Sequence, residues 1–268
     1  MIRLYISITF FLVAIGFHNS SGQTLISYTG TFDDGIASYE YYLSETGERM
    51  YHGAFTYKSV DDYKKDEIQI SGKFKNNLKF GLWKYTFHWK DETVFGHINR
   101  GKKIMISGNY ENGLLQGNWL YTEIDNATNK MIKKSTIQFK DGVPNNTYSY
   151  QDNKIVNQID YMQNISITGA YNEQGLMHGR WTIKYKINKI DYIDTRLYEE
   201  GKIKEHKVIN LSTGDKVEPE YDSSSQEQFN FELALSFWQC FDSYTCPETN
   251  LIFKYIKRGS NFKYNTND

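Results

Sequence analysis

One pattern of glycine and aromatic residues occurs three times in this chain, and it constrains the fold more than any other feature. Each copy begins Gly-x-aromatic, passes through a turn, and ends Gly-x-Trp-x-(Tyr or Ile). The copies are GKFKNNLKFGLWKY from Gly72, GNYENGLLQGNWLY from Gly108 and GAYNEQGLMHGRWTI from Gly169. The copies begin 36 and 61 residues apart, and such uneven spacing argues against a propeller or a strict solenoid. It favours a meander of hairpins whose loops differ in length.

Backbone geometry explains the fixed positions without any ligand. The turns are expected at Asn76-Asn77, Asn112-Gly113 and Gln174-Gly175, where Asn and Gly readily take the positive φ angles of a two-residue hairpin. The remaining glycines are expected to be bare strand positions that a Trp or Tyr from a neighbouring strand covers. We therefore assign a structural role to Gly72, Gly81, Gly108, Gly113, Gly117, Gly169, Gly175 and Gly179.

Side-chain alternation supports a sheet with one packed and one solvated face. After the first Trp, aromatic residues occupy every second position from Tyr85 to Trp89, with polar residues between them. A weaker element, a short apolar segment running into a polar pair and a Gly, follows each Trp at residues 97–102, 138–142 and 197–202. The sequence predicts an all-β, elongated, antiparallel, single-layer sheet over residues 23–215.

The pattern Gly-x-(Tyr/Phe) followed by Gly-x-Trp resembles the MORN repeat, and more closely the MORN-variant repeats of bacterial proteins described as antitoxin components. The resemblance covers about residues 72–202, with a faint extension back to residue 30. It implies an elongated sheet of hairpins used for scaffolding, self-association or partner binding. The chain departs from the family pattern in its long insertions, in the Trp after the second Gly, and in its N-terminal export signal.

The first 22 residues have the parts of a secretory signal peptide in the usual order. Arg3 precedes a largely apolar run from Leu4 to Phe17, and the small residues Ser20 to Gly22 follow it. We expect cleavage near Gly22 and a periplasmic, cell-surface or secreted protein, with an uncleaved membrane anchor as the alternative. After cleavage no other apolar run is long enough to span a membrane as a helix.

The composition changes near residue 216, and residues 216–268 are expected to form a C-terminal cap. Ser224 to Glu227 matches a capping box, and a short helix is expected over residues 225–240, although the alternating apolar residues there also fit a strand. Cys240 and Cys246 are the two cysteines of the chain. An oxidising compartment would permit a disulfide between them, and two free buried thiols are the alternative.

Charge and motifs give no support to several function classes. The chain has 31 basic and 32 acidic residues, so nucleic acid is not indicated as a partner. No pair of histidines has the spacing of a metal site, and His178 is interpreted as a loop residue. Acidic pairs such as Asp33-Asp34 are interpreted as solvated turns. We therefore assign no catalytic residue, no metal ligand and no cofactor.

These observations predict an exported, non-enzymatic repeat protein that acts as a scaffold or protein-binding surface, with a protein partner or self-association. The alternative is a carbohydrate-binding module, because aromatic rings on a flat sheet can stack on sugars. A cofactor-free hydrolase is the third reading. Exposure of the aromatic rings distinguishes the first two. The candidate binding residues are Trp83, Trp119, Trp181, Tyr85 and Tyr121.

Overall fold

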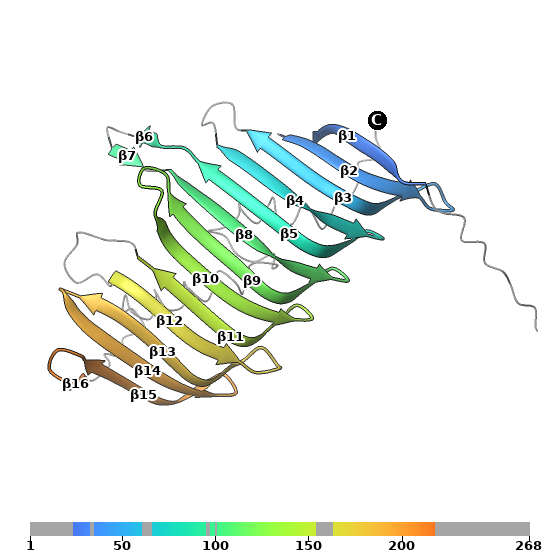
Figure 1. Ribbon diagram of the computed structural model, residues 1–268. Helices are drawn as coiled ribbons and strands as arrows, with labels where there is room; N and C mark the ends of the chain where they lie inside the picture. Colours follow the sequence, from blue (N-terminus) through green and yellow to red (C-terminus); the bar gives the residue numbers. More distant parts are fainter. Residues whose placement is uncertain are drawn as a thin grey trace, which may run out of the picture.

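The chain forms one long open sheet (Figure 1). The computed structural model describes residues 24–32, 35–60, 66–94, 97–99, 101–153 and 163–217. These residues contain strands and turns and no helix, so the predicted all-β class is confirmed for them. Fourteen strands pair in chain order, each antiparallel to the next, while β6 (Glu92–Val94) and β7 (His97–Asn99) form a separate two-stranded sheet.

The strands of the long sheet are mostly nine to twelve residues long. They are β1 (Ile26–Phe32), β2 (Gly35–Leu43), β3 (Arg49–Val60), β4 (Glu67–Lys75), β5 (Leu78–Trp89), β8 (Lys102–Glu111), β9 (Leu114–Asp125), β10 (Met131–Lys140), β11 (Val143–Asp152), β12 (Gln163–Tyr171), β13 (Met177–Ile187), β14 (Ile190–Glu199), β15 (Lys202–Asn210) and β16 (Lys216–Val217).

Consecutive strands form hairpins whose tips lie along one edge of the sheet, which we call the hairpin edge (Figure 1). The three sequence copies are the hairpins β4–β5, β8–β9 and β12–β13. Between the second and third lies the hairpin β10–β11, whose sequence has neither the first glycine nor the Trp. This extra hairpin is the physical reason for the longer spacing between the second and third copies.

The predicted tight turns are present in the first two copies. Asn76 and Asn77 have φ of 52° and 69°, and Asn112 and Gly113 have φ of 50° and 80°. Both pairs thus have the positive φ at the two central positions that a two-residue hairpin requires. The third copy has a longer turn, in which the Asn172 side chain accepts hydrogen bonds from the backbone N–H groups of Gln174 and Leu176. The extra residue of that copy therefore lies in its loop.

The two glycines of each copy have different roles, which corrects one expectation. Gly81, Gly117 and Gly179 are not covered by rings, and a Cβ there would have open space. Their φ values are 66°, 66° and 69°, and the strand register shifts beside each of them, so they form β-bulges. Glycine is required there because it takes positive φ without steric cost.

The rings cover the first glycine of each copy instead. A Cβ on Gly72, Gly108 or Gly169 would overlap the ring of Trp83, Trp119 or Trp181, respectively. In each copy the indole N–H also donates to the carbonyl of the residue after that glycine, at 3.1, 3.2 and 3.1 Å. The indole ring therefore lies flat on the neighbouring strand, and all three copies make the same indole-to-carbonyl hydrogen bond.

Large rings occupy the same lattice position in five successive hairpins, two residues after a bulge residue with positive φ. The bulge residues are Gly53, Gly81, Gly117, Asn146 and Gly179, and the ring residues are Phe55, Trp83, Trp119, Tyr148 and Trp181. Rings from adjacent hairpins meet edge to face, as Trp83 and Tyr110 do with centroids 6.0 Å apart. The core is this continuous row, and we call its side of the sheet the aromatic face and the other side the open face.

The weaker sequence element is a strand end followed by a turn at Asp141-Gly142 and at Glu200-Gly201. At residues 97–102 it instead falls on β7 and the start of β8, so there it belongs partly to the small sheet and not to a hairpin of the main one. The signal peptide expected at residues 1–22, the helix expected at 225–240 and the pair Cys240 and Cys246 lie outside the described residues. In the part of the chain that is described, no helix has the length and apolar character needed to cross a membrane.

Candidate functional site

The five aromatic residues proposed from the sequence as binding candidates lie in the core. Trp83, Trp119, Trp181 and Tyr85 are 0% exposed, and Tyr121 is 8% exposed. Each Trp has one ring surface on a glycine of the neighbouring strand. None of the five offers a free ring face on which a sugar could stack. Their observed role is packing, and binding has to be sought elsewhere on the sheet.

A row of exposed aliphatic side chains follows the hairpin edge on the open face. Each of four successive hairpins contributes the first or second residue after its turn, with an exposed fraction between 38% and 48%. These residues are Leu78, Leu114, Val143 and Leu176, and we call them the aliphatic ridge. Single exposed apolar residues are common on protein surfaces. Four at one repeating position form a continuous strip, which is a less common feature.

The turn glycines make the ridge continuous. A Cβ added to Gly113 would lie 3.3 Å from Leu78 Cδ2, and one added to Gly142 would lie 3.5 Å from Leu114 Cδ2. Val143 and Leu176 lie against Gly175 and Gly201 in the same way. Each ridge side chain thus rests on the bare turn of the next hairpin, because glycine leaves that surface open.

Backbone hydrogen bonds hold the turns in line. Gly113 N–H donates to the Lys79 carbonyl at 3.0 Å, and Gly142 N–H donates to the Leu115 carbonyl at 2.9 Å. The spacing of the ridge is therefore set by the sheet and not by flexible loops. The sequence carried a signal for it that we missed: an aliphatic residue directly follows the turn at positions 78, 114, 143 and 176.

The two ends of the ridge differ. At the β5 end, Phe80 and Leu82 extend the apolar surface on the open face, with 41% and 50% exposure. At the other end the next hairpin has Lys202 in the corresponding position after its turn. A charged residue thus terminates the strip there.

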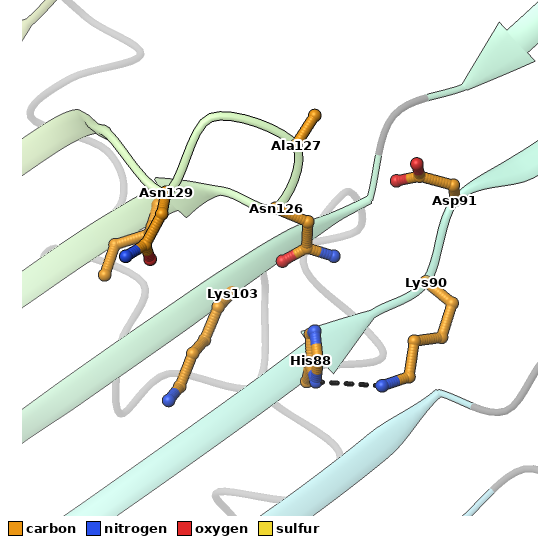
Figure 2. Close-up of a pocket in the computed structure, with 8 residues that line it drawn as sticks. His88, Lys90, Asp91, Lys103, Asn126, Ala127 and Asn129 are labelled. Carbon is orange, nitrogen blue, oxygen red and sulfur yellow. Dashed lines mark hydrogen bonds between the residues drawn. The ribbon is translucent and has the colours of Figure 1, made fainter.

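A pocket of about 460 Å³ lies at the opposite edge of the sheet, on the open face (Figure 2). Its floor is a cross-strand row formed by His88 of β5, Lys103 of β8 and Ile124 of β9. Lys90 and Asp91 lie on one side and the turn at residues 126–129 on the other. The turn is fixed because Asn126 donates from its side chain to the Trp89 carbonyl at 2.7 Å.

The pocket offers mainly hydrogen-bond donors. The Lys90 ammonium lies 3.2 Å from His88 Nδ1, as Figure 2 shows, and an ammonium group can only donate. His88 Nδ1 is therefore the acceptor, which leaves the ring proton on Nε2. Asp91 is occupied, since it accepts the Gly101 backbone N–H at 2.6 Å. Lys90 Nζ also lies 3.5 Å from the Glu67 carboxylate, whereas Lys103 in the floor has no ion-pair partner among the described residues. The uncompensated positive charge of the pocket is therefore that of Lys103.

Two clusters of Tyr, acid and Lys side chains interrupt the aromatic face near the edge opposite the hairpin edge. The first is centred on Glu123. Glu123 is 4% exposed, accepts a hydrogen bond from Tyr121 Oη at 2.6 Å and pairs with Lys102 Nζ at 3.1 Å. Burial alone would raise the pKa of Glu123, but Lys102, Lys133 and the Tyr121 hydroxyl outweigh it and hold the pKa below its usual value. Burial and the Glu123 charge raise the pKa of Tyr121.

The next hairpin repeats this arrangement one unit further along the sheet. Tyr150 Oη donates to Asp152 at 3.2 Å, and Lys133 Nζ lies 3.7 Å from the same carboxylate. Both groups place a Tyr two residues before an acid, with a Lys from the preceding strand. The repetition indicates that each carboxylate is a structural ion-pair member.

The last hairpin, β14–β15, carries a buried ionic cluster at core positions. Arg196 donates to both oxygens of Asp194, with its shortest contact at 2.7 Å, and His206 Nε2 lies 2.9 Å from Asp194 Oδ1. Asp194 and Arg196 are buried. Burial alone would lower the pKa of Arg196, but the Asp194 contacts outweigh it and raise the pKa. Arg196 and His206 face each other in the register, at the place where the three sequence copies have a glycine beneath a Trp ring.

Among the described residues, no group of three or more His, Cys, Asp or Glu side chains is arranged to hold a metal ion. The carboxylates of Glu123, Asp152 and Asp194 each have a cationic partner. What the arrangement offers at the surface is therefore the aliphatic ridge and the cationic pocket. Comparison of the chain with protein-family models and with curated proteins found no match.

Proposed function

We propose that this chain is an exported, non-enzymatic repeat protein whose sheet binds a protein partner along the aliphatic ridge. The observation that carries the proposal is the continuity of Leu78, Leu114, Val143 and Leu176 across four hairpins. Exposed apolar strips of this kind are typical of protein interaction sites. The resemblance to MORN-like repeats supports the same assignment, because such arrays are used for scaffolding and partner binding.

The rigidity of the ridge favours specific binding over non-specific hydrophobic association. Its residues follow turns that are hydrogen-bonded to the preceding hairpin, so little side-chain and loop entropy would be lost on association. Covering the exposed half of each aliphatic side chain would contribute roughly 1 kcal/mol. Four such residues, with charged neighbours such as Glu111 and Lys140 at the rim, suit a partner that presents its own apolar row.

The test compares two variants with matched loss of exposed apolar surface. The ridge variant is Leu114→Ser with Val143→Ser, and the control is Ile36→Ser with Leu211→Ser, which are exposed away from the ridge. Partners captured from the exported protein fraction of the host are identified by mass spectrometry and then purified. We expect the ridge variant to bind the purified partner at least about tenfold more weakly than the control. Equal affinity of the two variants would refute the ridge as the binding site.

Export is part of the proposal and has its own measurement. The N-terminal sequence of the protein recovered outside the cytoplasm should begin at or near Gln23. A full-length chain found in the cytoplasm would contradict it.

A second function is favoured by the pocket beside His88 and Lys103. Its donors, the Lys103 ammonium and the His88 ring, suit a small polar ligand, so a carbohydrate with an acidic group is the candidate in place of a ring-stacked sugar. Binding to an array of acidic and neutral glycans should be lost in Lys103→Ala with His88→Ala. Retained binding in that variant, or no binding by the wild type, removes this candidate.

A further inference from the structure

The side chains of the aromatic face are buried up to their tips. Tyr85, Tyr110 and Tyr148 are no more than 2% exposed, although each stands on one face of the sheet. Neighbouring side chains on that face stand about 5 Å apart across strands and about 7 Å apart along a strand, so they shield the flanks of a ring. The end of the side chain, which is farthest from the backbone, would remain in water on a single layer. Its burial requires a second layer of protein.

The tyrosine hydroxyl groups of this face are desolvated as well. Burial raises the pKa of Tyr121, Tyr148 and Tyr171 above the usual value of a tyrosine, and it is the largest cause of each shift. The hydroxyl oxygen is the outermost atom of a tyrosine that stands on a sheet. It would be hydrated first if nothing lay above it, so its desolvation also indicates protein atoms above the rings.

The open face of the same strands provides a comparison. Met105 in β8 and Leu120 in β9 lie at central positions of the open face, and both are partly exposed. Ile106 is the next residue of β8 and lies on the aromatic face, where it is 1% exposed. Apolar side chains of similar size in the same strands therefore differ by the face on which they lie. The additional cover is specific to the aromatic face.

The described strands do not supply this cover. Within the described ranges, all the extensive contacts between strands are between neighbours in a sheet. The burial occurs within one copy of the chain, so no second copy is needed for it. Residues 1–22 are expected to be removed as the signal peptide, and the longest gap between described ranges, residues 154–162, is too short to cover fourteen strands. Residues 218–268 remain.

We infer that the C-terminal segment, residues 218–268, packs along the aromatic face and is its second layer. The segment begins at one end of this face, because it follows β16, which pairs with β15. Buried apolar side chains extend from Val208 in β15 to Ala37 in β2, whereas Tyr28 of β1, on the same face, is 38% exposed. The cover therefore runs from β15 as far as β2.

The segment has the length and the composition for this position. Strands β2 to β15 span about 53 Å at about 4.8 Å per strand. The roughly 50 residues of the segment reach about 75 Å as a helix and about 165 Å when extended, so either conformation can run the length of the face. Residues 229–241 are rich in large apolar side chains and contain one charged residue, Glu232. Such a run is suited to burial against aromatic rings.

This arrangement limits the surfaces that are open to partners. The aromatic face carries the largest rings of the sheet, but the chain itself closes it. The aliphatic ridge and the open face remain accessible. The inference does not rest on the proposed function, since it concerns the opposite side of the sheet.

Photo-cross-linking tests which segment lies on the aromatic face. A photoreactive benzoyl derivative of phenylalanine is placed at Phe139, and the matched control carries it at Gln138 on the open face of the same strand. We expect at least about five times as many cross-links to residues 218–268 from position 139 as from position 138, because the reaction needs contact within about 4 Å. Cross-links from position 139 that join two chains, or that stay within residues 24–217, overturn the inference.

A site-specific cut tests the association without a change on the aromatic face. A protease recognition site inserted after Ser224 lets the full-length chain fold before it is cut. We expect the two fragments to elute together from a sizing column in native buffer and to separate in urea. The ridge variant Leu114→Ser with Val143→Ser should behave in the same way, which separates this inference from the proposed function. Release of the C-terminal fragment in native buffer overturns the inference.

Discussion

At the scale of single residues, the structure separates two uses of glycine that look alike in the sequence. Gly108 is needed because the Trp119 ring occupies the space of a side chain, whereas Gly117 is needed because its φ is 66°. Asn146, at the position of Gly117 in the next hairpin, has φ of 58°. Asn is among the residues that tolerate the left-handed backbone conformation, so a bulge position of this sheet can hold either Gly or Asn.

The cost of substituting Gly108 should depend on the Trp119 ring, whereas the cost of substituting Gly117 should not. Gly108→Ala should destabilise the protein by about 1 to 3 kcal/mol through overlap with Trp119, and much of this cost should disappear in a Trp119→Leu background. Gly117→Ala should cost about 1 kcal/mol in both backgrounds, and Gly117→Asn less. Urea unfolding of the wild type, the single variants and the double variants measures these differences in unfolding free energy. A Gly108→Ala cost that is independent of Trp119 would contradict the packing explanation.

The ionised Glu123 should make stability depend on pH. Its folded pKa is held below its usual value, so its stabilising contribution is complete above the unfolded pKa of about 4.3 and disappears as pH falls through the folded pKa. The free energy of unfolding of wild type should therefore fall more steeply below about pH 5 than that of Glu123→Gln. Unfolding curves measured between neutral and acidic pH test this. Parallel pH profiles for the two proteins would mean that Glu123 has the same pKa folded and unfolded.

At the scale of elements, the sequence was sufficient for the hairpins that kept their fixed residues. Asn112-Gly113 specifies its turn through local backbone preference, so β8–β9 could be predicted without tertiary information. The hairpin β10–β11 was not recognised because Ile137 and Tyr148 replace the glycine and the Trp while the backbone path is the same. Burial of Trp119 and exposure of Leu114 depend on which face is covered, and alternation alone does not decide that.

The last hairpin should show the difference between breaking and replacing an ionic core. Arg196→Leu leaves Asp194 buried without its main partner and should destabilise the protein by about 3 to 5 kcal/mol. The triple variant Asp194→Ile, Arg196→Gly and His206→Trp installs the residues used at the same positions of the other hairpins. It should recover most of that loss. Thermal unfolding of both variants provides the comparison, and a triple variant no better than Arg196→Leu would assign the cluster a role other than packing.

At the scale of the whole molecule, stability is distributed along a line. Each strand of the main sheet pairs with its neighbours in the chain and has no long-range partner strand among the described residues. Arrays of this kind are stabilised by the sum of their units and the contacts between them, so the ends should open more readily than the centre.

Hydrogen exchange should follow that line. Amides of β1 and β15 should exchange faster than those of β8 to β10, where the aromatic row continues on both sides. Uniform protection along the sheet would indicate a single cooperative unit.

The identity between strand order and chain order also bears on how such a chain changes length over time. A segment that contains one complete hairpin can be duplicated or lost in the gene, and the strands on either side of it still meet as neighbours. The hairpin β10–β11, which has the shared backbone but not the shared glycine and Trp, shows that a unit can keep its place in the sheet with different residues at these two positions.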